Sequence, residues 1–137
     1  MGRMIKLTIP GQPVAKQRPK VFNGHGVTPA KTVNYETLVK ELYIMQNYRQ
    51  QLEGQLRIRV AAYFQIPQSK SKKVKEAMLN GSIRPTSKPD WDNVGKIISD
   101  ALNGLAYHDD SQIVEAHVFK WYSDNPRVEV WVQEIGV

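Results

Sequence analysis

The sequence predicts one α/β (α+β) domain over residues 1–137, in which helices cover a small mixed sheet of four strands. Two observations lead to this prediction. Four segments alternate apolar and polar residues, and three others carry apolar residues at helical spacing, so the predicted order is β-α-β-α-α-β-β. The 137 residues are 41% hydrophobic and contain no repeat, linker or biased tract, which suits one buried core without a second domain.

The first half of the chain predicts a strand, a helix and a second strand. Residues 4–9 alternate and stop at Pro10-Gly11, as a strand does. Residues 11–29 are rich in Gly and Pro and predict a loop. A helix is predicted from Tyr35 to about residue 53, based on the apolar positions Leu38, Val39, Leu42 and Met45. Residues 56–60 alternate again and predict the second strand, which breaks at Pro67.

The second half predicts two helices and two strands. Residues 69–82 are typical of a short basic helix that Asn80-Gly81 closes. Residues 94–105 have apolar positions on one side only, which predicts an amphipathic helix ending at Asn103-Gly104. Two alternating segments follow, residues 112–122 and 127–135. Because only four residues join them, we expect a hairpin.

The composition favours a soluble cytoplasmic protein with a polyanionic partner. The chain has 19 Lys+Arg against 13 Asp+Glu, a formal net charge of +6, which suits nucleic acid. It has no cysteine, so disulfides and thiolate zinc sites are excluded. The first eleven residues lack the apolar run of a signal peptide, and the longest apolar runs are too short to cross a bilayer, so we expect no membrane association.

One window of this basic chain is acidic. The stretch SKPDWDNVGKIISDALNGLAYHDDSQ, residues 87–112, contains Asp90, Asp92, Asp100, Asp109 and Asp110. Each has an ordinary structural explanation, because carboxylates cap helix starts, form i,i+4 ion pairs and occupy turns. Together they could also form one functional site, if the strand after Asp110 returns toward the start of the preceding helix or if that helix lies across the end of the sheet.

A cluster of carboxylates would favour a divalent cation. Three carboxylates ~5 Å apart repel one another by about 3 kcal/mol per pair at an effective dielectric constant of ~20. Oxygen ligands suit Mg²⁺, with Mn²⁺ as an alternative. An EF-hand is rejected because Val94 and Ala101 occupy two of its ligand positions. A carboxylate metal site on a basic protein suits phosphodiester hydrolysis, with Lys96 placed to contact the scissile phosphate.

Motifs near both ends of the chain point to a known family. The acidic window contains Lys88-Pro89-Asp90-Trp91-Asp92-Asn93, then Lys96, Asp100-Ala101-Leu102-Asn103-Gly104 and Asp109-Asp110-Ser111-Gln112. Residues 11–20, Gly-Gln-Pro-Val-Ala-Lys-Gln-Arg-Pro-Lys, form a G-x-P-x-x-K-x-R-P loop. Both sets resemble the RusA family of Holliday junction resolvases, and the resemblance covers essentially the whole chain.

The resemblance implies a RusA-like fold and a small homodimeric crossover junction endodeoxyribonuclease from bacteria, phages or prophages. Such enzymes use Mg²⁺ to resolve four-way DNA junctions by paired symmetric nicks in recombination and repair. It assigns the catalytic and metal-binding carboxylates to Asp90, Asp92 and Asp110, and the catalytic lysine to Lys96. Asp109 is the less favoured ligand of its pair. The resemblance also implies that Lys16, Arg18 and Lys20 contact DNA.

Two other functions fit the same residues. One is a DNA-binding or architectural module without catalysis, and the other is a metal-dependent nuclease that acts on flaps or forks. A dimer is expected because a junction presents two related strands while one chain carries one acidic window. Trp121 and Trp131, in the predicted hairpin, are expected at the dimer interface or in the core.

Overall fold

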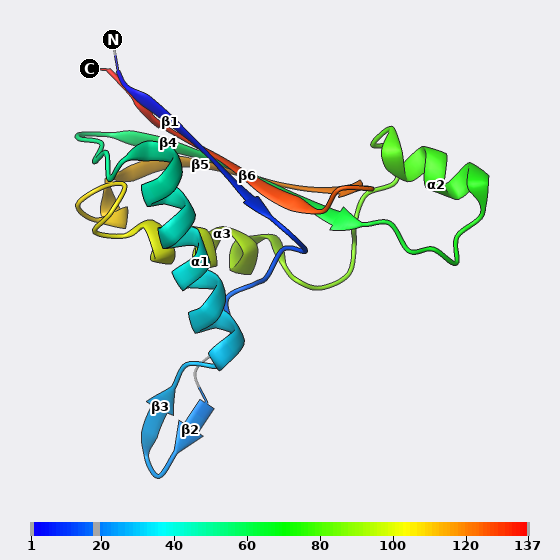
Figure 1. The fold of residues 1–137 in the computed structure, drawn as a ribbon, viewed down its shortest axis with the longest axis horizontal. Coiled ribbons are helices and arrows are strands. Elements are labelled where there is room, and N and C mark those ends of the chain that lie inside the picture. Colours follow the sequence, from blue (N-terminus) through cyan, green and yellow to red (C-terminus); the bar gives the residue numbers. More distant parts are fainter. Residues whose placement is uncertain (1, 18–19, 137) are drawn as a thin grey trace.

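The computed structural model describes residues 2–17 and 20–136, and its elements follow the predicted order (Figure 1). The main strands are β1 (Met4–Pro10), β4 (Leu56–Gln65), β5 (Ile113–Ser123) and β6 (Arg127–Glu134). The helices are α1 (Ala30–Asn47), α2 (Lys72–Leu79) and α3 (Trp91–Leu102). A small hairpin, β2 (Lys20–Phe22) with β3 (His25–Val27), and the 3₁₀ turn η1 (Asp110–Gln112) complete the described elements. The predicted α+β class and mixed four-stranded sheet are confirmed.

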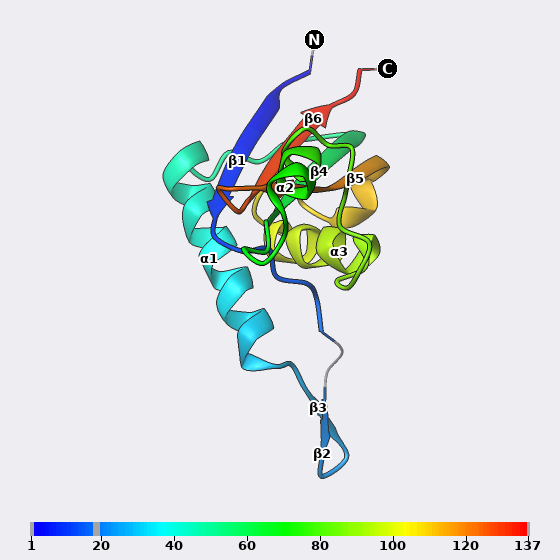
Figure 2. The same cartoon turned by 90° about the vertical axis from the view of Figure 1, so that its right-hand side faces the viewer.

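The four-stranded sheet has α1 and α3 on one face. Its strand order is β1-β6-β4-β5, with β6 antiparallel to both neighbours and β5 parallel to β4. Helix α1 packs against β1 and α3 against β5, on the same side of the sheet, whereas α2 lies beyond the end of the sheet (Figures 1 and 2). Within the described residues, no helix has the length and apolar character needed to span a membrane.

Alternating strand residues build the core beneath these helices. In β1, Ile5, Leu7 and Ile9 are buried and lie opposite buried valines of β6. Strand β4 adds alternate residues and also buries consecutive residues 60–62, as a central strand does. Each fully buried aliphatic side chain contributes about 1.5–3 kcal/mol, so these strands supply much of the stability of the fold.

The last two strands do not form the predicted hairpin. Strand β4 lies between β5 and β6 and pairs with both. Two strand spacings are ~9.6 Å, and the four Cα steps from Ser123 to Arg127 can span ~13 Å, so the short connection crosses β4. The buried run in β4 favours the centre of the sheet, and this preference outweighs adjacency in the sequence.

Helix α1 begins and ends earlier than predicted, and its buried residues share only Val39 with the predicted apolar positions. It follows Pro29 and ends at Tyr48, whose φ of 53° is left-handed. Its buried residues are Thr32, Tyr35, Val39 and Tyr43, whereas Met45 is 72% exposed. The prediction relied on aliphatic positions, but tyrosine rings also bury a large apolar area. The Tyr43 hydroxyl donates a hydrogen bond to the carbonyl of Gln50.

Residues 20–27, predicted as loop, form the β2–β3 hairpin, which projects from the N-terminal end of α1 (Figures 1 and 2). Its turn residues, Asn23 and Gly24, both have positive φ, 49° and 79°. Asn-Gly is the favoured sequence for a two-residue turn of this kind. The hairpin could therefore have been predicted from this dipeptide.

Helices α2 and α3 lie where the sequence predicts helices, although α3 begins and ends three residues earlier than the predicted range of 94–105. The side chain of Ser71 caps α2 by accepting a hydrogen bond from the backbone of Val74, and Gly81 follows the helix with a φ of 86°. Helix α3 ends at Asn103, and Gly104 then adopts a φ of 77°. Its buried stripe consists of Val94, Ile97, Ile98, Ala101 and Leu102.

The carboxylate of Glu134 holds the two ends of the described chain together. It accepts hydrogen bonds from the guanidinium and backbone N–H of Arg3, at 3.0 and 2.8 Å, and from the backbone N–H of Glu53, at 2.7 Å. The Arg3 side chain, followed by these backbone groups, lowers the pKa of Glu134 from 4.5 to about 2. A lowered folded-state pKa stabilises the protein above the unfolded pKa, and this contribution is lost as the pH falls through the folded value.

Glu134→Gln should therefore lower the melting temperature at neutral pH, and the difference from wild type should shrink as the pH falls from 4.5 to about 2. Thermal melts across this range measure the difference. Glu41→Gln is the control, because Glu41 is an exposed residue of α1 without an ion pair among the described residues, and it should melt with wild type throughout. A difference in melting temperature between Glu134→Gln and wild type that stays the same at every pH would contradict the prediction.

Candidate active site

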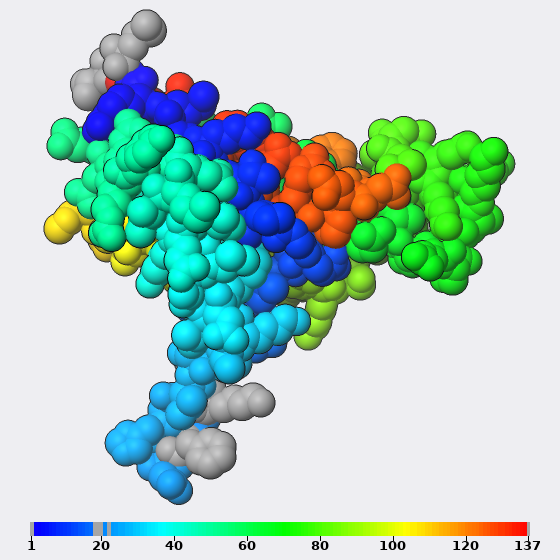
Figure 3. Space-filling view, in the orientation of Figure 1, coloured from blue at the N-terminus to red at the C-terminus, as the bar shows by residue number. Residues whose placement is uncertain are grey.

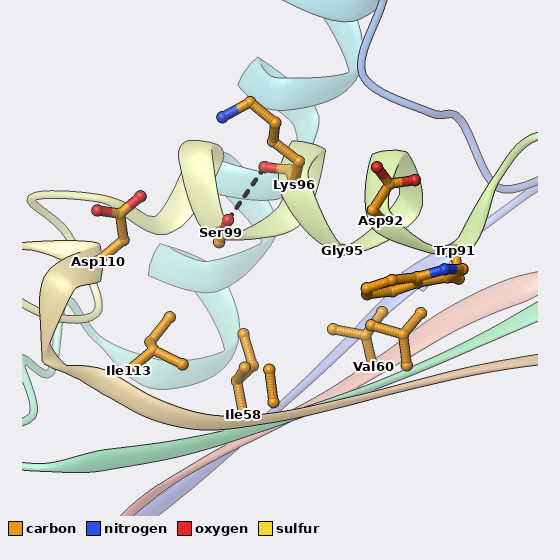
Figure 4. A pocket seen from close by; sticks show the side chains of 11 residues that line it. Ile58, Val60, Trp91, Asp92, Gly95, Lys96, Ser99, Asp110 and Ile113 are labelled. Atoms are coloured by element: carbon orange, nitrogen blue, oxygen red, sulfur yellow. Dashed lines mark hydrogen bonds between the residues drawn. The ribbon is translucent and has the colours of Figure 1, made fainter.

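An open cavity of about 300 Å³ lies between helix α3 and the parallel strands β4 and β5 (Figure 4). Strand side chains supply its apolar wall, which consists of Ile58, Val60, Ile113, Ala116 and Val118. The opposite side is polar and contains Asp92, Lys96, Ser99 and Asp110. The fold therefore joins two aspartates and the lysine of the acidic window in one cavity.

Gly95 allows α3 to lie close to β5 at this cavity. A Cβ atom at this position would lie 3.1 Å from Cγ2 of Val118, closer than ordinary van der Waals contact. A side chain here would either push the helix from the sheet or fill the space between Asp92 and Ser99. The absence of a side chain keeps the cavity open.

The three predicted catalytic aspartates lie near opposite ends of α3. Asp90 is the N-cap residue and Asp92 lies in the first turn. Asp110 follows the C-terminal end, where its backbone N–H donates to Oδ1 of Asn103 at 3.0 Å. Figure 4 shows Asp92 and Asp110 on opposite sides of the cavity, with Lys96 between them. Asp90 lines an adjoining cavity of about 610 Å³ together with Asp92.

The carboxylates of Asp90, Asp92 and Asp110 have no protein partner among the residues that the structure describes. None accepts a hydrogen bond, and none lies within 4.0 Å of a basic nitrogen. Unpaired carboxylates beside a cavity are available to a cation or to water.

The other two aspartates of the window are bonded within the protein. Asp100 lies 3.2 Å from the ammonium of Lys16 and 3.6 Å from that of Lys96. Asp109 accepts hydrogen bonds from the hydroxyl and backbone N–H of Ser111, and its own N–H donates to the side chain of Gln112 at 3.0 Å. The hydroxyl of Ser111, with its backbone N–H, lowers the pKa of Asp109. These two carboxylates stabilise the local structure.

Lys16 does not occupy the open position expected of a DNA contact. Its ammonium lies 3.2 Å from both Glu36 and Asp100, and its side chain is 21% exposed. Partial burial favours a lower pKa for Lys16, but hydrogen bonds and charges from the two carboxylates outweigh burial and raise it. Lys16 therefore ties the N-terminal loop to α1 and α3, and a DNA contact by Lys16 stays a prediction.

The structure gives less information on Arg18 and Lys20, the other two predicted DNA contacts. Arg18 lies outside the described residues. Lys20 begins β2 in the projecting hairpin, opposite Val27. A DNA contact at either position stays a prediction.

Trp91 is a residue of this site that the sequence analysis did not single out. It is 65% exposed and lines both the 300 Å³ cavity and the adjoining one (Figure 4). It lies three residues before Val94 and seven before Ile98, so helical spacing places it on the side of α3 that faces the sheet. Trp91 could have been selected from the sequence because it is an aromatic residue between two acidic residues at the start of a helix.

Neither Trp121 nor Trp131 lies in the core, so the core interpretation is wrong for both. They are on the sheet face opposite α1 and α3, where cations lie over the rings. The Arg84 guanidinium is 3.6 Å from the ring centroid of Trp121, and the Lys6 ammonium is 5.3 Å from that of Trp131. Their predicted role in a dimer interface stays a prediction.

The aspartates suit magnesium by chemistry, although three of them do not converge. In the described part of the chain, no group of three or more acidic or histidine side chains is arranged to hold a metal. Mg²⁺, however, is commonly bound by one or two carboxylates together with water and substrate phosphate. Asp92 shares one cavity with Asp110 and another with Asp90, so either pair offers oxygen donors that have no protein partner.

A basic α+β domain with unpaired carboxylates and a lysine at one open cavity suits a nuclease. Comparison with known proteins agrees, because residues 10–133 match the family model described as Endodeoxyribonuclease RusA. The chain belongs to the RusA family, as its motifs predicted, and membership implies endodeoxyribonuclease activity. A relative, the uncharacterized protein YqaN of Bacillus subtilis (strain 168), is 42% identical over 138 residues, which cover 96% of this chain and 97% of the relative.

Lys16→Met should destabilise the protein by about 1–2 kcal/mol, because Glu36 and Asp100 would keep their partly buried charges without the ammonium. Urea denaturation at neutral pH measures the change. Lys31→Met, an exposed lysine of α1 with no ion pair in the described structure, is the control and should lose less than about 0.5 kcal/mol. Equal losses in the two variants would show that the ion pairs of Lys16 do not stabilise the fold.

Proposed function

We propose that this protein is a Mg²⁺-dependent, structure-selective endodeoxyribonuclease that resolves four-way DNA junctions by paired symmetric nicks in recombination and repair. Membership of the RusA family supports branched DNA as the substrate. One observation carries the assignment of the site. The three aspartates that the motifs select, Asp90, Asp92 and Asp110, are the ones without a protein partner, whereas Asp100 and Asp109 are bonded.

Lys96 supplies positive charge at the cavity. Its ammonium lies 3.6 Å from Asp100, and its side chain is 59% exposed, so it keeps donors free for a phosphate oxygen. A positioned cation stabilises the negative charge that develops on the scissile phosphate. Lys16 also pairs with Asp100, the carboxylate that contacts Lys96. Lys16 and Asp100 are therefore positioning residues for Lys96.

Asp92, with Asp90 or Asp110, would hold Mg²⁺, and Mn²⁺ suits the same oxygen donors. When bound, the metal supplies a Lewis acid that activates water and stabilises the leaving oxygen. The chain keeps these carboxylates unpaired and leaves the cavity beside them open. Gly95 and the apolar wall of the cavity maintain this space.

A homodimer would supply the second active site that paired nicks require. One chain carries one cavity with Asp92, Lys96 and Asp110, and a two-fold dimer presents two related sites to two related strands. Trp121 and Trp131 are the interface candidates, because they lie on the sheet face away from α1 and α3.

Asp92→Asn and Asp110→Asn should each slow junction cleavage by about 100-fold or more and leave junction binding intact, because each removes a charge from the cavity and none from the basic surface. Lys96→Ala should reduce the rate of junction cleavage by a larger factor than it reduces junction affinity. Cleavage of a synthetic four-way junction is compared with that of matched linear duplex, flap and fork DNA, with and without Mg²⁺. Asp109→Asn should retain cleavage, and Asp124→Asn, in the exposed β5–β6 connection, is the matched control.

Different outcomes contradict different parts of this proposal. Normal cleavage by Asp110→Asn together with loss in Asp109→Asn would reverse the assignment within that pair. Junction binding by wild type without cleavage in Mg²⁺ or Mn²⁺ would favour the architectural module. Equal cleavage of junctions, flaps and forks would favour the broader nuclease.

A further inference from the structure

Residues 70–88, which we name the α2 arm, carry most of the net charge of the protein. The arm has six basic residues and one acidic residue, a net charge of +5 out of +6 for the whole chain. The rest of the chain is nearly neutral, at +1. The basic residues of the arm are Lys70, Lys72, Lys73, Lys75, Arg84 and Lys88.

The lysines of the α2 arm have no anionic partner within the described structure. Its ion pairs involve no residue of the arm, and Lys70, Lys72 and Lys73 are exposed. Lys72 and Lys73 also occupy the first turn of α2, where the helix dipole disfavours cations and acidic residues would be more stable. The arrangement lowers stability, as expected of a surface retained for binding.

Packing and hydrogen bonds fix the α2 arm to the sheet. Met78 is buried, and the Arg84 guanidinium lies 3.6 Å from the ring centroid of Trp121 and donates to the carbonyl of Lys120 at 2.9 Å. The Lys120 ammonium donates in turn to the carbonyl of Ser87 at 2.8 Å. The arm therefore has a defined position, and it projects beyond the end of the sheet (Figures 1 and 3).

The α2 arm leads directly to the candidate active site. Its residues Pro85, Thr86 and Ser87 line the cavity of about 610 Å³ that also contains Asp90, Trp91, Asp92 and Lys120. A DNA strand with a phosphate at Asp92 can continue along this cavity toward α2. The α2 arm therefore begins at the candidate site and extends away from it along this cavity.

We propose that the α2 arm binds the phosphate backbone of the duplex arm that adjoins the cut site. This inference rests on the proposed function, since that function places the duplex beside Asp92. Lysine ammoniums contact phosphates as point charges and independently of base sequence. The α2 arm adds affinity for DNA and does not take part in the cleavage step.

Two double variants with the same net charge test this inference. Lys72→Gln/Lys73→Gln removes two exposed charges from α2, and Lys40→Gln/Arg49→Gln removes two exposed charges from α1 and the residues after it, so each lowers the net charge from +6 to +4. Junction affinity is measured in chelator at several salt concentrations. The α2 variant should bind more weakly, and its plot of log affinity against log salt should be shallower by about 2, at ~0.9 per phosphate contact. The Lys40→Gln/Arg49→Gln control should keep the wild-type slope. Both double variants should cleave the junction at the wild-type rate when the DNA is saturated with protein.

Equal slopes for the two double variants would overturn the inference, because total charge would then explain any loss. A saturated cleavage rate that falls in the α2 variant alone would also overturn it, since the arm would then act in catalysis. If the proposed function is wrong, the wild-type protein will bind the junction no more tightly than linear duplex and will cut neither DNA. Failure of this inference leaves wild-type cleavage intact and is visible only in the comparison of the two variants.

Discussion

Helix α3 has to bury one apolar face, and this requirement fixes the direction of every polar group on it. With Val94, Ile98 and their neighbours against the sheet, the 3.6-residue turn places two polar flanks on the remaining surface. One flank faces the cavity beside β5 and carries Asp92, Lys96 and Ser99. The other faces the N-terminal loop, where Asp100 meets Lys16. Asp100 connects the two flanks, because it pairs both with Lys16 of the loop and with Lys96.

The ion pairs of Lys16 connect this helix to the rest of the fold. One ammonium contacts Glu36 on α1 and Asp100 on α3, and the backbone N–H of Lys16 donates to the carbonyl of Asn93 at 3.0 Å. Three segments distant in the sequence thus meet at one residue. In this arrangement Asp100 is neutralised by lysines, whereas Asp92 is left with its charge exposed to the cavity.

Much of the fold could be predicted from local pattern, and the exceptions have physical causes. Strand β1 and helices α2 and α3 each combine one clear periodicity with a Gly-containing stop, so local sequence was sufficient. Pairing of β5 with β4 was missed because the choice of partner depends on which strand is most buried. The buried face of α1 was predicted only in part, because Tyr35 and Tyr43 flank Val39 there in place of further aliphatic residues. At the site, the motif selects Asp90, Asp92 and Asp110, but their placement at the two ends of α3 and the ion pairs of Lys16 depend on packing that spacing does not show.

A crystal structure with junction DNA and Mn²⁺ would show whether the unpaired aspartates hold the catalytic metal. Anomalous diffraction at the manganese edge locates the ion without assumptions about its ligands. We expect a peak between Asp92 and the scissile phosphate, with Asp90 or Asp110 as the second carboxylate. A peak at Asp100 or Asp109, or a bound junction with no manganese near Asp92, would contradict it.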